Sequence, residues 1–304
     1  MKNHAVAGSA LRARLQAFIQ LSRLKFLTGG VLGFALGALV ARYEGYPLDA
    51  GTYALGQLMV TSFHLMVHYA NDYFDRFCDA RAERTPWSGG SGILQNGAIS
   101  PSVALGAALA CAGIGILGIV AFALRGNGTA AAAGIACGLL GWIYSAPPVR
   151  LLARGWGELN AALLVGVIFP LTGYVAFAPS PSPRLLATTL PSLAAMFVLM
   201  FCVEYPDVEV DRATGKLNLV AKRGRAGSRM LVYSAVAAIY VGGAVALAFG
   251  APPSLAVFLA LTAPLGWSLC LRLTAAADAE IAARGVAMFV VTILGSALAY
   301  LSVL

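Results

Sequence analysis

Long runs of apolar residues, separated by short segments that hold most of the charges, are the dominant pattern along this chain. A transmembrane helix needs about 20 consecutive apolar residues. Nine runs approach that length, at residues 26–41, 53–70, 103–124, 129–144, 159–177, 186–203, 231–249, 255–273 and 286–304. The pattern predicts an all-α fold, namely a polytopic membrane bundle of nine transmembrane helices that forms a single domain over residues 1–304.

The composition agrees with a membrane location. Hydrophobic residues make up 59% of the chain and charged residues 11%, whereas a soluble domain carries about 25% charged residues. The five cysteines include no CxxC pair, so we interpret them as small apolar residues and not as a zinc site or a disulfide framework. Residues 1–20 show no cleavable signal peptide, because no uninterrupted apolar core precedes a cleavage site.

The distribution of basic residues predicts the orientation in the membrane. If the N-terminus is cytoplasmic, all but three of the 21 lysines and arginines lie on the cytoplasmic side, the exceptions being Arg42, Arg125 and Arg184. This is a strong positive-inside signal. It predicts a cytoplasmic N-terminal segment (1–22), cytoplasmic loops at 71–100 and 204–229, and a C-terminus outside.

Acidic residues are concentrated in two short segments, at residues 71–79 and 204–211, which hold more than half of the 13 in the chain. Each segment lies where a long apolar run ends, and both fall on the predicted cytoplasmic side. Charge close to a bilayer is costly without a compensating partner. Carboxylates without nearby bases commonly find that partner in Mg²⁺, whose coordination substrate phosphates can complete.

The spacing within the two segments suggests a shared site. Asn71, Asp75 and Asp79 lie at i, i+4 and i+8, which places them on one stripe of a helix. Asp207 and Asp211 repeat the i, i+4 spacing, with Glu204 about one turn earlier. Two such helix ends facing each other could hold Mg²⁺ ions and a diphosphate. The alternative is a set of solvated loop carboxylates that pair with nearby arginines.

Basic and hydroxyl side chains surround these segments and could contact phosphate. They are Arg23, Lys25, Arg84, Lys216, Tyr144 and Ser145. Arginine suits bidentate phosphate contacts and lysine supplies a point charge. Each basic residue taken singly is also explained as a determinant of topology. Tyr144 and Ser145 precede Pro147 and Pro148, which must end their helix.

Three ordered motifs give the chain a resemblance to the UbiA superfamily of intramembrane prenyltransferases. The matching residues are Asn71-Asp72-x-x-Asp75-x-x-x-Asp79, Tyr144-Ser145-x-Pro147 and Asp207-x-x-x-Asp211, the last continuing through Gly215-Lys216. Nine spans with a cytoplasmic N-terminus are similar to that family as well, and the resemblance implies that the loops at 71–100 and 204–229 are catalytic. The resemblance covers nearly the whole chain and implies the UbiA-type fold in a bacterial or archaeal cell membrane.

The resemblance also implies roles for individual residues. It implies Mg²⁺ binding by Asn71, Asp75, Asp207 and Asp211, with Asp72 and Asp79 as supporting catalytic residues. It further implies diphosphate contacts from Arg23, Lys25, Arg84, Tyr144, Ser145 and Lys216. The implied partners are a prenyl diphosphate, an aromatic small-molecule acceptor and the lipid bilayer, without nucleic acid.

Residues 89–97 and 156–158 are similar to the branch of the superfamily that prenylates 1,4-dihydroxy-2-naphthoate in menaquinone synthesis. His68 departs from that branch, which often has Asn there. His64 lies one turn earlier, so the two form either a buried hydrogen-bonded pair or part of an acid/base site.

The expected reaction is Mg-dependent ionisation of an allylic prenyl diphosphate and attack by the aromatic acceptor. The proton acceptor is left open among Glu204, Glu209, Glu158 and His68. Alternatives within the superfamily are another acceptor, such as hydroxybenzoate, a quinolone or a lipid alcohol, or terpene cyclisation. A cation transporter is the alternative from another class, although its path would need polar groups at mid-bilayer, and few exist.

Overall fold

Helices account for every regular element that the computed structural model describes, over residues 2–274 and 277–304. The elements are α1 (Lys2–Ser22), η1 (Leu24–Leu27), α2 (Thr28–Tyr43), α3 (Ala50–Asp79), α4 (Pro101–Leu124), α5 (Gly128–Ser145), η2 (Leu151–Arg154), α6 (Gly157–Leu163), η3 (Leu164–Ile168), α7 (Phe169–Val175), α8 (Pro183–Glu204), α9 (Val208–Thr214), α10 (Leu219–Ala248), α11 (Ser254–Arg272) and α12 (Asp278–Leu301). The predicted all-α class is confirmed.

Eight helical stretches within these ranges are long and apolar enough to cross a membrane. The predicted count of nine spans is therefore not confirmed. The predicted span 53–70 lies within α3, which is not among the eight. Its apolar sequence is diluted by Gln57, His64 and His68 before the acidic stripe begins. The chain is a multi-pass membrane protein, and the side that each terminus faces stays a prediction.

Local sequence signals explain where several helices begin and end. Asp49, Asn127 and Ser182 each accept a hydrogen bond from a backbone N–H in the first turn of the following helix, at 2.8, 3.0 and 3.1 Å. Such caps satisfy donors that the helix itself leaves free. α5 ends at Ser145, as its position before Pro147 predicts.

Small residues allow the helices to approach closely. A Cβ added to Gly37 would lie 1.7 Å from the carbonyl oxygen of Pro170, and one added to Gly173 would lie 2.0 Å from that of Phe34. The backbones of α2 and α7 are therefore in direct contact, as is common where small residues line a membrane helix interface.

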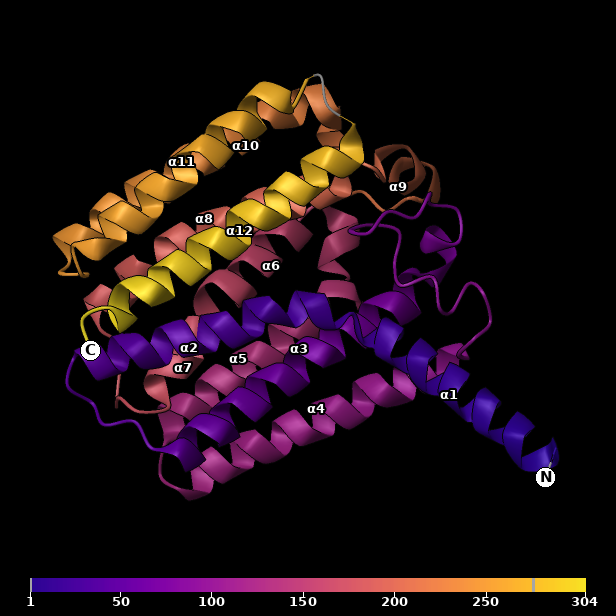
Figure 1. Cartoon of the computed structure of the whole chain (residues 1–304), viewed down its shortest axis with the longest axis horizontal. Coiled ribbons are helices and arrows are strands. Elements are labelled where there is room, and N and C mark those ends of the chain that lie inside the picture. Colours follow the sequence, from indigo (N-terminus) through magenta and orange to yellow (C-terminus); the bar gives the residue numbers. More distant parts are fainter. Residues whose placement is uncertain (1, 275–276) are drawn as a thin grey trace.

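The elements that carry the acidic segments gather at one end of the bundle. α9 and the loop after α3 lie together there, and α1 projects from the same end, while the C-terminus lies at the other (Figure 1). Residues 71–79 are the last turns of α3, and α4 begins at Pro101. Of the first predicted catalytic loop, 71–100, only residues 80–100 therefore lie outside a helix.

The second predicted loop, 204–229, is mostly helical. α8 ends at Glu204, a short turn contains Pro206, and α9 starts after Asp207. Proline has no backbone N–H to continue the helix. Glu204 therefore ends one helix and Asp207 precedes the next, where the sequence pattern suggested one face of a single helix. Gly224, with φ of 72°, interrupts the start of α10.

Candidate active site

Lys216 joins the two acidic segments. Its Nζ lies 3.4 Å from an Asp75 oxygen on α3 and 3.6 Å from an Asp211 oxygen on α9. Both carboxylates are buried, as is most of the lysine side chain. A buried charge needs a partner of opposite sign. The expected convergence of the two segments is thus present, with an ammonium group between them.

The glycine-rich loop after α3, residues 80–100, lies over both acidic segments. The backbone N–H of Gly89 donates to Asp207 Oδ2 at 3.2 Å, and that of Ser91 donates to Asp72 Oδ2 at 3.3 Å. Gly90 has φ of 67°, and a Cβ added there would lie 2.3 Å from Asp79 Oδ2. Glycine at this position lets the backbone approach the carboxylate.

Two of the predicted phosphate-binding bases lie at the junction of α1 and η1. Arg23 has a left-handed backbone, with φ of 49°, and its Nη1 lies 3.5 Å from Asp72 Oδ1. Lys25 donates to the carbonyl of Pro86, and its Nζ lies 4.2 Å from the ring centroid of Trp87. Arg23 therefore ties the N-terminal part of the chain to α3, and Lys25 ties it to the loop after α3.

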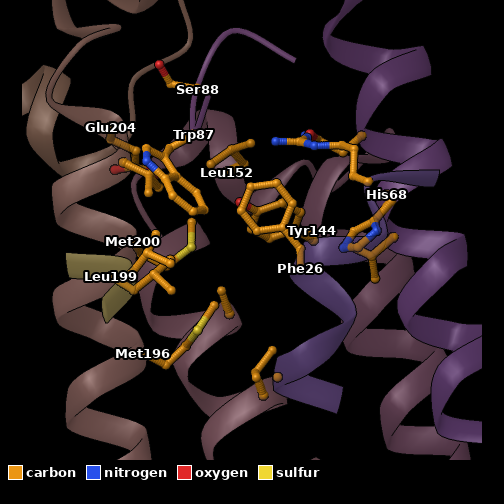
Figure 2. Close-up of a pocket in the computed structure, with 18 of the residues that line it drawn as sticks. Phe26, His68, Trp87, Ser88, Tyr144, Leu152, Met196, Leu199, Met200 and Glu204 are labelled. Carbon is orange, nitrogen blue, oxygen red and sulfur yellow. The ribbon is translucent and has the colours of Figure 1, made fainter. Parts of the chain in front are cut away.

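A cavity of about 200 Å³ opens below this polar layer. Its upper wall includes Arg23, Lys25, Asn71, Asp79, Asp207 and Lys216. Its deeper wall is apolar, with Met196 and Leu199 of α8 and Phe289 of α12. Figure 2 shows Trp87 and Ser88 at the top and Met196 furthest from them. The cavity therefore has one charged end and one apolar end.

Several carboxylate oxygens at the charged end have no hydrogen-bond partner. Asp79 Oδ2, Asp207 Oδ1 and both oxygens of Glu204 are buried and unpaired, and all three residues line the cavity. Hard divalent cations bind oxygen donors of this type. The donor set therefore fits Mg²⁺. As the side chains stand, no group of three or more His, Cys, Asp or Glu residues in the described ranges is arranged to hold a metal.

The electrostatics around α9 reflect this crowding of buried charge. Burial raises the pKa of Asp207 to about 6, although Lys216 opposes the shift. Burial also raises the pKa of Asp211. Burial alone would lower the pKa of Lys216, but Asp75 and Asp211 beside it raise that pKa well above its usual value. A second cation near these carboxylates would relieve their mutual repulsion.

The structure separates the predicted residues into those that line the cavity and those that do not. The cavity is lined by His68, Asn71, Asp79, Glu204, Asp207, Arg23, Lys25, Tyr144 and Lys216. The residues that do not line it are Asp72, Asp75, Asp211, Ser145 and Arg84. Asn71 connects the two sets, since its Nδ2 donates to Asp75 Oδ2 at 3.0 Å and to Ser145 Oγ at 3.1 Å. Arg84 donates to the carbonyl of Ser91 and supports the loop.

The four candidate proton acceptors differ in position. Glu209 is 71% exposed and lies near Arg212 and Arg225, away from the cavity. Glu158 is fully buried, and its Oε1 accepts a hydrogen bond from the backbone N–H of Leu219. Among the four, Glu204 and His68 line the cavity.

Sequence reasoning missed two polar residues that position the acids. Asn218 donates to Asp211 Oδ2 at 2.6 Å while its Oδ1 caps α10. Arg150, which also has a left-handed backbone, lies 3.7 Å from Asp75. In the sequence, Arg150 is one of many basic residues on the predicted cytoplasmic side and Asn218 lies outside both acidic segments, so neither position stands out without the tertiary structure.

Comparison with known proteins places these features in a family. The model of the UbiA prenyltransferase family matches residues 31–298. A 1,4-dihydroxy-2-naphthoate octaprenyltransferase from Bacillus subtilis is 23% identical over 252 residues, which covers 82% of this chain and 80% of that protein. A 2-carboxy-1,4-naphthoquinone phytyltransferase from Synechocystis is 32% identical over 98 residues, or 32% of each chain.

Solved structures share the fold. A digeranylgeranylglyceryl phosphate synthase superposes with a TM-score of 0.68 and 17% identity, over 95% of this chain and 99% of that one. A UbiA homologue from Archaeoglobus fulgidus bound to GPP and Mg²⁺ gives a TM-score of 0.64 and 17% identity, over 93% and 99%. With the family match over most of the chain, these findings confirm the resemblance: the chain belongs to the UbiA prenyltransferase family and is a membrane prenyltransferase.

Proposed function

We propose that this protein catalyses Mg²⁺-dependent transfer of a prenyl group from an allylic prenyl diphosphate to an aromatic acceptor of the naphthoate type. The observation that carries the proposal is the two-ended cavity, whose charged end holds both acidic segments and whose deep end is apolar. An allylic prenyl diphosphate has the same division between an anionic head and an apolar chain.

The charged end suits the diphosphate. Arg23, Lys25 and Lys216 line it and supply cations for phosphate oxygens. Asn71, Asp79 and Asp207 line the same end and supply oxygen ligands for Mg²⁺, and Asp75 and Asp211 pair with Lys216. Mg²⁺ bound there would neutralise charge on the departing diphosphate. The solved UbiA homologue bound to GPP and Mg²⁺ supports this choice of ligands.

The deep end suits the isoprenoid. Met196, Leu199, Val286 and Phe289 provide an apolar wall, which offers water no hydrogen-bond partner. Exclusion of water protects a reactive allylic cation from hydrolysis. The naphthoate-type acceptor is supported by the names of the Bacillus and Synechocystis relatives, both of which act on naphthalene-derived substrates.

The test is a product analysis with the purified full-length protein in lipid nanodiscs. Prenyl diphosphates of several chain lengths are each combined with 1,4-dihydroxy-2-naphthoate, 4-hydroxybenzoate or no acceptor, with Mg²⁺ or with a chelator, and products are identified by mass spectrometry. We expect a prenylated naphthoate that requires Mg²⁺. A product with hydroxybenzoate alone, a cyclised terpene, or full turnover after chelation would each contradict the corresponding part of the proposal.

A further inference from the structure

The imidazole ring of His68 is held by a backbone carbonyl. Its Nδ1 lies 3.1 Å from the carbonyl oxygen of Ser22. A carbonyl oxygen can only accept a hydrogen bond, so Nδ1 carries the hydrogen. A second proton would place an uncompensated charge on a buried ring, because the nearby Asp72 already pairs with Arg23. In the neutral ring, Nε2 is then left with a lone pair and no hydrogen.

The break between α1 and η1 is what makes this carbonyl available. α1 ends at Ser22 because Arg23 adopts the left-handed conformation. The last carbonyl groups of a helix have no partner within it. The hydroxyl of Ser22 also lies 2.7 Å from that of Tyr69, the residue after His68 on α3. Two neighbouring contacts therefore fix the chain break against α3 and set the orientation of the imidazole.

Nε2 is directed toward free space. His68 is 8% exposed and lines the cavity, and no hydrogen-bond partner of Nε2 occurs among the residues of the described ranges. Figure 2 shows the ring at the cavity wall, across from Leu199 and Met200. His68 precedes Asn71 by about one helical turn, so its ring lies deeper in the bundle than the carboxylates.

Aromatic rings flank His68. Phe26 lies edge-on at 6.2 Å and His64 lies at 4.8 Å between ring centroids. Aromatic side chains in such orientations favour the faces and edges of another ring. This part of the cavity therefore combines a lone pair with aromatic walls, which suits a flat molecule that carries a hydroxyl group.

We propose that Nε2 of His68 accepts a hydrogen bond from a hydroxyl group of the aromatic acceptor and thereby selects hydroxylated acceptors over their O-alkylated analogues. The inference rests on the proposed function, since it concerns the acceptor of the same reaction. It assigns His68 to acceptor recognition and not to metal binding, because Mg²⁺ prefers oxygen ligands.

Two substitutions separate the two ring nitrogens. In His68→Asn the side-chain amide can reach the position of Nδ1, which keeps the contact with Ser22 and removes Nε2. In His68→Gln the longer side chain can place its carbonyl oxygen near the position of Nε2, which keeps an acceptor in the cavity. Kinetics are measured for both variants with 1,4-dihydroxy-2-naphthoate and with its mono-O-methyl ethers.

We expect the wild-type protein to favour the free hydroxyl, and His68→Asn to lose roughly tenfold of that preference, the effect of one hydrogen bond. The KM for prenyl diphosphate should stay constant, and His68→Gln should keep most of the preference. A His68→Asn variant with the wild-type preference would overturn the inference, as would a wild-type protein with no preference. Absence of any naphthoate product in the wild-type protein rejects the proposed function instead.

A second measurement does not depend on turnover. Nitrogen NMR on ¹⁵N-histidine-labelled wild-type protein reports which ring nitrogen is protonated, and His68→Asn identifies the His68 signals among the three histidines. Protonated Nδ1 with unprotonated Nε2, and a shift of Nε2 on addition of 1,4-dihydroxy-2-naphthoate, support the inference. A ring protonated at Nε2, or an Nε2 signal that the acceptor leaves unchanged, overturns it.

Discussion

Two polar clusters lie at opposite ends of this bundle, and among the described residues only the cluster near α9 has buried side-chain oxygens without a hydrogen-bond partner. Glu44 follows α2 at the end away from α9 (Figure 1). Its carboxylate accepts hydrogen bonds from Ser182 Oγ at 2.8 Å, from Arg184 Nη1 at 3.0 Å and from the hydroxyl of Tyr174. It therefore links the end of α2 to α7 and to the start of α8.

The acids at the other end are incompletely paired. Asp79, Asp207 and Glu204 keep buried oxygens without partners, although Lys216, Arg23 and loop amides are close by. Most buried polar groups in proteins are satisfied. A carboxylate with a full set of partners, such as Glu44, therefore serves the fold, whereas unpaired oxygens around a cavity indicate a binding site.

The largest effect is expected from a substitution at the end near α9, where carboxylate oxygens are unpaired. Asp207→Asn should reduce turnover by about 10²–10³-fold, because one preorganised polar group at the departing charge is lost. The melting temperature should barely change. Glu209→Gln is the matched control on the same segment, since Glu209 is exposed and outside the cavity. Turnover of both variants is measured by steady-state kinetics, and wild-type turnover in Asp207→Asn would show that Asp207 is not part of the site.

The role of Lys216 can be examined through stability. Lys216→Met should lower the stability of the metal-free protein by about 3 kcal/mol, because Asp75 and Asp211 lose their shared cation. Mg²⁺ should restore part of the loss, measured as a larger Mg²⁺-dependent rise in melting temperature than in the wild type. Lys222→Met provides the control, as Lys222 is exposed and donates to a backbone carbonyl. Equal Mg²⁺ responses would show that Lys216 and the metal do not share a site.

At the end that holds Glu44, we expect a substitution to reduce stability and to leave turnover unchanged. Glu44→Gln should cost about 2 kcal/mol of stability, since charge-assisted hydrogen bonds to Arg184 and Tyr174 are weakened. Turnover per folded molecule should be unchanged. Denaturation and kinetics on the same preparation separate the two quantities, and a selective loss of turnover would contradict the division between the two clusters.

The smallest effect concerns the glycine-rich loop. Gly90→Ala and Gly97→Ala change residues with φ of 67° and 73°, so each carries a similar backbone cost of about 1 kcal/mol. Only at Gly90 would the new Cβ press on Asp79, because nothing lies within 4 Å of a Cβ at Gly97. Turnover should fall roughly tenfold, or about 1.4 kcal/mol in activation free energy, in Gly90→Ala alone. Equal turnover in the two variants would mean that Asp79 tolerates the contact.

Helix positions could be predicted from this sequence because apolar runs and caps are local properties. The end of α5 before Pro147 and the single helical stripe of Asn71, Asp75 and Asp79 are both present. The span predicted at residues 53–70 was harder, since Gln57, His64 and His68 make α3 a weak hydrophobic signal.

The arrangement of the site was only partly predictable. The i, i+4 spacing located the acidic segments, and the structure brings them together at Lys216. Spacing could not show that Asp79 and Asp207 line the cavity while Asp75 and Asp211 do not, because side-chain direction depends on tertiary packing. The contact between His68 and Ser22 joins residues 46 positions apart and has no local signature.

Arg23 limits which residues evolution can accept at its position. Its left-handed backbone is easily adopted by glycine and, among other residues, best by asparagine, yet neither carries the guanidinium that pairs with Asp72. Lysine would keep the positive charge but not the planar group, and it would bear the same strain. Mutational scanning at position 23 should therefore show that few residues are tolerated. Residues that fit the left-handed backbone lack the guanidinium group, and lysine, which keeps the positive charge, is strained in that backbone.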